Sequence, residues 1–237
     1  MRKILLFTLL LSISNSKCIY DIVEKLKSSY PQIKGCKDNY LIFQDGTKIL
    51  FDDEKQKSFN ELLNNPDIED MFKFKYPLNK IIPSKNFDPG RIRNDLFFKK
   101  IYGKSANEVR KNLRYINWFG KKILVTKVNN IDKKLQAIEK ELKKLPKGYR
   151  KFLTPIGGTF KWRYIAGTKR LSVHSFGAAI DINVKYSHYW KWSKDLKYKN
   201  KIPYKIVEIF EKYGFIWGGK WYHYDTMHFE YRPELLK

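Results

Sequence analysis

Two short stretches of the sequence carry histidines and carboxylates at spacings that suit a metal site. HSFGAAID begins at His174 and ends at Asp181, and DTMH begins at Asp225 and ends at His228. In AIDIN, Ile180 and Ile182 alternate with Ala179, Asp181 and Asn183, as in a strand with one apolar face. Asp181 should therefore lie on the face opposite the two isoleucines. His174 precedes this strand in a loop, and His228 begins a second predicted strand. The side chains of His174, Asp181 and His228 can therefore converge on one point.

Two imidazoles and one carboxylate would form a three-ligand zinc site whose fourth coordination position stays open. Open zinc sites are the catalytic kind, because water or substrate can take the fourth position. Bound zinc lowers the pKa of its water towards ~7 and polarises a carbonyl group. A carboxylate beside the ion must then accept the water's proton and pass it to the leaving amine. The position of Asp225, three residues before His228, predicts this role for it.

The joint pattern S-x-H-x-x-G-x-A-x-D, followed by D-x-x-H-F-E, is much rarer than either histidine motif alone. It resembles the D-alanyl-D-alanine carboxypeptidase family of zinc peptidases, which includes L-alanyl-D-glutamate endopeptidases and vancomycin-resistance enzymes with a hedgehog-type zinc fold. The resemblance covers roughly residues 155 to 235. It implies zinc held by His174, Asp181 and His228, with Asp225 as the catalytic acid and base. The residues that carry it are Ser172, His174, Gly177, Ala179, Asp181, Asp225, His228, Phe229 and Glu230.

The segment FKWRYIAGTKRLSVH is similar to the part of that family that leads into the metal motif and contains an arginine near the site. Arg163 is the matching residue here. An arginine in this place could stabilise the carbonyl oxygen as negative charge develops. Pairing with a carboxylate, or anchoring the loop, is the alternative role. Many family members have glutamate where this chain has Asp225, so the peptide bond that is cut stays open between the carboxypeptidase and endopeptidase types.

Several neighbours of these motifs have predicted supporting roles. Glu230 should orient His228, since alternate residues of a strand share a face. Ser172 should support the metal loop through hydrogen bonds. Arg91 and Arg93 could bind substrate carboxylates, but structural salt bridges are the expectation. His223 is either a hydrogen-bond donor behind the ligands or an exposed ring.

The first sixteen residues, MRKILLFTLLLSISNS, have the three-part pattern of a secretory signal peptide. The apolar run is shorter than the ~20 residues of a membrane-spanning helix, so no stable membrane insertion is expected after its removal. The sequence thus predicts an exported protein, periplasmic or extracellular. Cys18 and Cys36 are the only cysteines, and an oxidising compartment favours a disulfide between them over two separate thiols.

The chain is strongly basic, with 48 Lys and Arg against 24 Asp and Glu and a formal charge of +24. A surface of this charge attracts polyanions. The lysines are scattered, without a compact basic block or a nucleic-acid-binding motif, which argues against a nucleic-acid partner. For an exported monomer, anionic cell-envelope polymers are the expected partners beside peptidoglycan peptides.

The elements that must position the site follow an α+β pattern rather than regular βαβ alternation. We expect a small antiparallel sheet with flanking helices that carries the zinc site in residues 151–237. A mixed α/β accessory region should precede it in residues 17–150. The predicted elements are a hairpin at 40–53, a helix from Ser58 to Pro66 with a further turn behind it, a turn at 88–90 followed by a helix, a helix and a strand within 107–129, a helix capped by Asp132 and stopped by Pro146, a helix at 203–214, and the strands FIWGG and MHFEY.

These features predict an exported zinc peptidase that hydrolyses peptide bonds in peptidoglycan stem peptides. The substrate follows from the family resemblance and not from the spacing of the motifs. The alternative is a non-catalytic, zinc-containing protein that binds the cell wall. The presence of Asp225 and the open coordination position argue against that alternative.

Overall fold

The computed structural model describes residues 18–237 of the chain, so the predicted signal peptide at 1–16 lies outside the described residues. Cys18 and Cys36 form a disulfide that joins the segment before the first helix to the first strand. Within the described residues, no helix is both long and apolar enough to cross a membrane.

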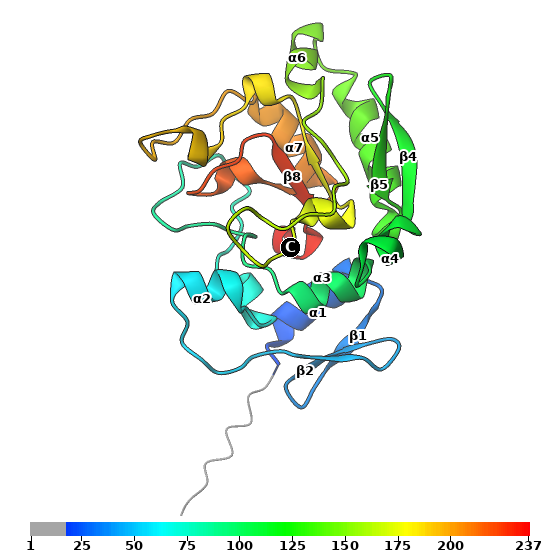
Figure 1. Cartoon of the computed structure of the whole chain (residues 1–237), viewed down its shortest axis with the longest axis vertical. Helices are drawn as coiled ribbons and strands as arrows, with labels where there is room; N and C mark the ends of the chain where they lie inside the picture. The colour runs from blue at the N-terminus through cyan, green and yellow to red at the C-terminus, as the bar shows by residue number, and fades with distance from the viewer. Residues whose placement is uncertain (1–17) are drawn as a thin grey trace, which may run out of the picture.

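The fold is a mixed α+β arrangement with small antiparallel sheets, as expected from the sequence. In the described part of the chain the strands form three sheets, of which the third is central and carries the site (Figure 1). The first sheet has the order β1-β2-β3, the second is the hairpin β4-β5, and the third has the order β6-β8-β7. The strands are β1 (Ile33–Lys37), β2 (Tyr40–Phe43), β3 (Lys48–Leu50), β4 (Leu113–Trp118), β5 (Lys121–Thr126), β6 (Ala179–Asp181), β7 (Phe215–Trp217) and β8 (His228–Tyr231).

Seven α-helices of the described chain surround these sheets, with α7 beside the central sheet and α5 beside the β4–β5 hairpin (Figure 1). They are α1 (Tyr20–Ser29), α2 (Phe59–Asn64), α3 (Asp95–Tyr102), α4 (Ala106–Arg110), α5 (Ile131–Leu142), α6 (Arg150–Leu153) and α7 (Tyr204–Lys212). Short 3₁₀ helices connect them: η1 (Glu69–Phe72), η2 (Val128–Asn130), η3 (Lys147–Tyr149), η4 (Val173–Phe176), η5 (Val184–Tyr186), η6 (Trp190–Trp192), η7 (Gly218–Lys220) and η8 (Pro233–Leu236).

The helix caps follow the sequence closely in the first half of the chain. Ser58 caps α2 with a reciprocal capping box to Glu61, and Asn94 caps α3 by accepting from the Phe97 N–H. The predicted cap of α5 is wrong. Helix α5 begins at Ile131, and Asp132 lies in its first turn, where its buried carboxylate accepts a hydrogen bond from Arg114 at 3.0 Å.

The central sheet places polar and apolar residues on opposite faces. Strand β8 lies in the middle, and β6 pairs with it in register so that Asp181 faces His228 and Ile180 faces Phe229. The Phe229 ring stacks on Phe210 of α7 with the ring centres 3.9 Å apart. Helix α7 therefore covers the apolar face, and the side chains of Asp181 and His228 point to the other face.

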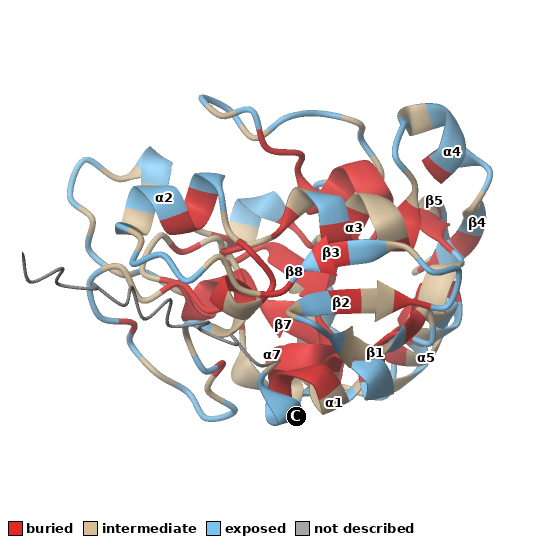
Figure 2. Ribbon diagram, turned by 90° about the horizontal axis from the view of Figure 1, so that it is seen from below, coloured by how far each residue is buried: buried red, intermediate tan, exposed pale blue. Residues whose placement is uncertain are grey.

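Residues from both halves of the sequence share one hydrophobic core, and β7, β8, α3 and α7 each contribute buried residues to it (Figure 2). Leu26, Phe97 and Ile138, which precede residue 150, belong to the same cluster as Phe176 and Phe210, which follow it. The division of the chain at residue 150 stays a prediction from the sequence. The upstream elements nevertheless pack directly against those that carry the site.

Candidate metal centre

His174 lies in the 3₁₀ helix η4, which ends at Gly177 in the left-handed conformation with φ of 65°. The Gly177 carbonyl accepts a hydrogen bond from the Thr126 N–H of β5 at 3.0 Å. A Cβ atom at residue 177 would lie 2.7 Å from the Leu113 side chain and 3.0 Å from the Thr126 nitrogen. Glycine is therefore required both by the backbone angle and by the close approach of the β4–β5 hairpin.

The hydroxyl group of Ser175 ties η4 to the preceding segment. It accepts from the Arg163 N–H at 2.9 Å and donates to the Arg163 carbonyl at 2.9 Å. Ser172, which we expected to support the loop, contributes its backbone N–H, which also donates to the Arg163 carbonyl. The supporting hydroxyl thus belongs to Ser175.

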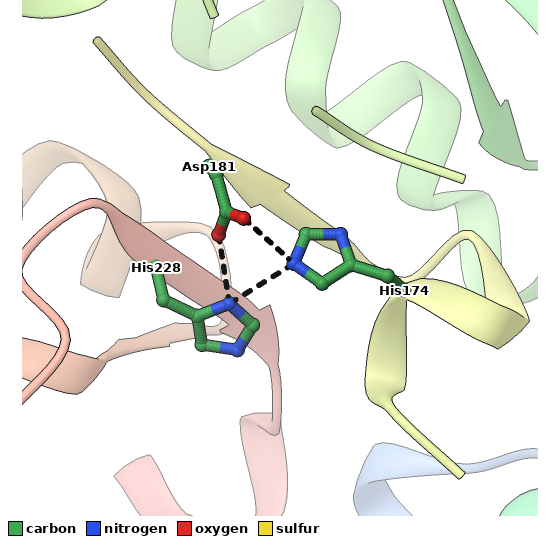
Figure 3. A group of neighbouring side chains, drawn as sticks. All are labelled: His174, Asp181 and His228. Carbon is green, nitrogen blue, oxygen red and sulfur yellow. Dashed lines mark hydrogen bonds and ion pairs between the residues drawn. The ribbon is translucent and has the colours of Figure 1, made fainter. Parts of the chain in front are cut away.

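The structure brings His174, Asp181 and His228 together at one point (Figure 3). His174 Nε2 lies 3.1 Å from Asp181 Oδ2 and 3.2 Å from His228 Nδ1. His228 Nδ1 lies 2.9 Å from Asp181 Oδ1. One ligand atom of each residue faces those of the other two, which is the arrangement that a metal ion requires.

The far side of each imidazole decides where its proton resides. His174 Nδ1 lies 2.6 Å from the Thr159 carbonyl, which can only accept, so Nδ1 carries the proton. His228 Nε2 lies 2.9 Å from Glu230 Oε2 and donates to it in the same way. A bound cation would displace any proton between the ligands, and the facing nitrogens of the then neutral imidazoles, His174 Nε2 and His228 Nδ1, would carry lone pairs. Two lone pairs and a carboxylate directed at one point fit a divalent cation such as zinc.

The charge on Glu230 is set by its neighbours. Burial alone would raise the pKa of Glu230, but the charge of Arg93 and the hydrogen bond from His228 outweigh burial and lower it to about 2. Arg93 Nη1 lies 3.0 Å from this carboxylate, and Arg232 Nη1 lies 3.4 Å from it. Burial lowers the pKa of His228, but Asp181 and Glu230 together raise it well above its ordinary value. The two carboxylates therefore favour a positive charge at His228, and a bound divalent cation would supply that charge in place of the proton.

Asp225 lines the same cavity as the three converging residues, which measures about 110 Å³. Its backbone N–H donates to the Gly218 carbonyl, and its own carbonyl accepts from the His228 N–H at 3.2 Å. Its Oδ1 atom is buried and has no hydrogen-bond partner among residues 18–237. Burial and the nearby charge of Asp181 raise the pKa of Asp225 to about 7. A carboxyl group in this condition suits proton transfer near neutral pH.

Arg163 also lines the cavity, and its side chain is exposed. Its guanidinium forms no salt bridge within the described part of the chain, so the alternative of a paired carboxylate has no counterpart in the structure. Its backbone, by contrast, anchors η4 through Ser172 and Ser175. The side chain stays available to a ligand.

The remaining predicted neighbours have clear structural partners. Arg93 pairs with Glu230, and Arg91 pairs with the buried Asp88 at 2.6 Å, so both arginines form the expected salt bridges. His223 Nδ1 lies 2.6 Å from Asp88 Oδ2, and the ring lines the cavity instead of standing exposed.

Several cavity residues had no assigned role in the sequence, among them two aromatic residues and an arginine. Tyr189 and Trp190 form part of the wall, and Arg170 lies where the cavity meets a larger groove. Nothing in the sequence marked Arg170 or the Thr159 carbonyl.

Two acidic clusters elsewhere also bring three carboxylates each close together, and the ammonium of one lysine is paired with members of both. The ammonium of Lys57 is buried and lies 2.9 Å from Asp53, 2.9 Å from Asp67 and 2.5 Å from Asp70. These clusters are internal salt-bridge networks and not candidate metal centres. Their members are Asp52, Asp53 and Asp67 in one, and Asp67, Glu69 and Asp70 in the other.

A mixed α+β fold with a His₂Asp cluster beside the buried carboxyl group of Asp225 defines a protein with a candidate metal centre. Residues 166–231 match the family model described as D-alanyl-D-alanine carboxypeptidase. This segment contains all three converging residues and Asp225, and the match confirms the family resemblance seen in the sequence. The match supports a peptidase. No curated protein and no solved structure matches the chain.

Proposed function

We propose that the protein is an exported zinc peptidase that hydrolyses peptide bonds in peptidoglycan stem peptides. The observation that carries the proposal is the pair of imidazole nitrogens, His174 Nε2 and His228 Nδ1, which face Asp181 while their far nitrogens are bound as donors. His174, Asp181 and His228 would hold the zinc. The family match to a D-alanyl-D-alanine carboxypeptidase supports the substrate class. The disulfide and the basic charge are consistent with an exported protein that meets anionic cell-envelope polymers.

Bound zinc would supply Lewis acidity that activates water and polarises the scissile carbonyl. The chain supplies the remaining steps. Asp225 accepts the proton of the attacking water and delivers it to the leaving amine nitrogen. Arg163 donates N–H groups to the carbonyl oxygen as negative charge develops on it. Tyr189 and Trp190 form a wall of the cavity against which the peptide packs.

The test is digestion of purified peptidoglycan by the mature protein, with and without a chelator, followed by mass analysis of the fragments. Loss of a terminal D-Ala would identify a carboxypeptidase, and release of peptides beginning with D-Glu would identify the endopeptidase type. Retention on the cell wall without any fragments would favour the non-catalytic wall-binding alternative. Hydrolysis that persists unchanged in the chelator would contradict zinc dependence.

A further inference from the structure

Arg170 is a buried arginine that forms no salt bridge within the described part of the chain. The backbone of Arg170 forms hydrogen bonds with Thr168 and Ile165. The residue as a whole is only 8% exposed. The single hydrogen bond of the guanidinium runs from Nη1 to the Arg91 carbonyl at 3.5 Å. Its Nε atom is buried without a partner among residues 18–237, where no carboxylate forms a salt bridge with it. A buried charge normally has a counter-ion, so a missing one needs an explanation.

Two neighbouring arginines increase this imbalance, and the charge of Asp95 offsets only part of their effect. Arg91 and Arg93 also line the cavity, and each is already paired, Arg91 with Asp88 and Arg93 with Glu230. Burial, together with the charges of Arg93 and Arg91, lowers the pKa of Arg170 to about 10. The guanidinium is therefore still charged at neutral pH, and no salt bridge among residues 18–237 neutralises that charge.

Arg170 lies at the junction of two hollows. With Arg93, it lines both the metal-centre cavity and a neighbouring groove of about 840 Å³. The wall of the groove also includes the amides Asn64, Asn65 and Asn94 and the charged residues Asp95 and Lys169. A peptide bound at His174, Asp181 and His228 can extend past Arg170 into this groove.

We propose that Arg170 binds a carboxylate of the peptide substrate close to the scissile bond and thereby selects the bond that is placed at the metal centre. This inference rests on the proposed peptidase function. A guanidinium binds a carboxylate through two parallel N–H···O hydrogen bonds, which would satisfy the orphaned Nε and neutralise the unpaired charge. The ligand class is a peptide with a free carboxylate. Its source is either the chain terminus or the α-carboxylate of a γ-linked glutamate.

The experiment compares two matched pairs of synthetic stem peptides with the zinc-loaded mature protein. One pair ends in D-Ala-D-Ala as the free acid or the carboxamide. The other contains L-Ala-γ-D-Glu with the α-carboxylate free or amidated. We expect amidation in one pair to lower kcat/KM by about 10- to 100-fold, as for loss of a hydrogen bond to a charged group. The pair that responds identifies the source of the carboxylate.

Arg170→Gln should lower kcat/KM on the free acid by a similar factor and should leave the amide almost unaffected, so that the preference disappears. Arg170→Lys should keep part of the preference, because it keeps the charge without the planar fork. Arg110→Gln, the same change at an exposed arginine, should behave like the wild type. An Arg170→Gln variant that still prefers the free acid as strongly as the wild type would overturn the inference.

Binding measured by calorimetry with the same four peptides separates this inference from the proposed function. If the wild type hydrolyses no peptide, the peptidase proposal fails, yet tighter binding of a free acid that depends on Arg170 would still support the carboxylate site. If the wild type hydrolyses the peptides but neither cleavage nor binding responds to amidation, the peptidase proposal stands and the role of Arg170 is wrong. Should Arg170→Gln not fold, the same comparison with Arg170→Lys decides.

Discussion

Asp181 and His228 lie directly opposite each other on neighbouring antiparallel strands, with 2.9 Å between Asp181 Oδ1 and His228 Nδ1. The register of β6 against β8 thus brings two ligand atoms together that are 47 residues apart in the chain. His174, presented by η4, completes the cluster from outside the sheet. Two of the three proposed ligands therefore depend on backbone pairing, and the third depends on how η4 docks against β5.

Asp181→Asn should abolish stable zinc binding, because it replaces the only anionic donor of the cluster with a neutral amide. Mutation of a residue that only supports a metal ligand lowers metal affinity by about 10- to 100-fold. We expect the zinc affinity of Asp181→Asn to fall by more than this, because the ligand itself is changed. Metal content after dialysis, measured by atomic emission, checks this. Asp195→Asn, at an exposed site, is the matched control and should bind zinc like the wild type.

Asp225→Asn should separate metal binding from catalysis. Asp225 is proposed to move a proton and not to hold the ion, so we expect kcat to fall about 10²- to 10⁴-fold while zinc content is unchanged. The comparison uses peptidoglycan hydrolysis and metal analysis on the same preparation. A variant that loses zinc together with activity would instead make Asp225 a ligand.

Glu230→Gln should weaken both the fold and the metal centre. The carboxylate accepts from His228 and pairs with Arg93 and Arg232, so its removal leaves buried positive charge uncompensated. We expect the free energy of unfolding to fall by about 3–5 kcal/mol and the zinc affinity to fall about 10- to 100-fold. Urea unfolding and a zinc competition assay measure the two effects. An unchanged zinc affinity in the folded variant would show that His228 keeps its orientation without Glu230.

Gly177→Ala should destabilise the protein more than Gly120→Ala does. Both glycines have positive φ, but a Cβ atom at Gly120 meets open space, whereas one at Gly177 meets Leu113 and Thr126. The left-handed backbone costs about 1–2 kcal/mol in each variant. Overpacking adds about 1–3 kcal/mol at Gly177 alone. Equal unfolding free energies in urea would argue that η4 does not need its close contact with β5.

Acid should remove the stabilising effect of Asp88. Burial raises the pKa of this carboxyl, but the hydrogen bonds from His223 and the charge of Arg91 outweigh burial, so the pKa lies below its usual range. A carboxyl whose pKa is lower in the folded state stabilises the fold above its unfolded value, and the effect is lost as the pH falls through the folded value. The difference in stability between the wild type and Asp88→Asn should therefore be constant near neutral pH and shrink below about pH 4. Urea unfolding at a series of pH values tests this, and a difference that grows with acidification would contradict it.

Much of the site could be predicted from the sequence, because its information is local. The strand alternation around Asp181 and Glu230 and the cap at Ser58 each depend on residues within a few positions of one another. Strands β1 and β4 were missed, although Ile116 and Trp118 alternate with exposed residues in β4. Asp132 was misassigned because its salt-bridge partner, Arg114, lies on another element.

The features that could not be predicted depend on contacts between distant segments. The Thr159 carbonyl, which holds His174, is a backbone atom that leaves no signature in residue types. The Nε atom of Arg170 is left without a hydrogen-bond partner by the way distant segments pack around it, which the residue types near it in the sequence do not indicate. The same holds for the close approach of Thr126 to Gly177.

The two imidazoles are held by partners of very different kinds. His228 depends on a particular side chain, that of Glu230, whereas His174 depends on a main-chain oxygen that any amino acid at position 159 would supply. Position 159 is thus free to drift during evolution as long as the path of the chain is kept, while position 230 is not. Divergent descendants of this protein should vary at the first position and keep an acid at the second.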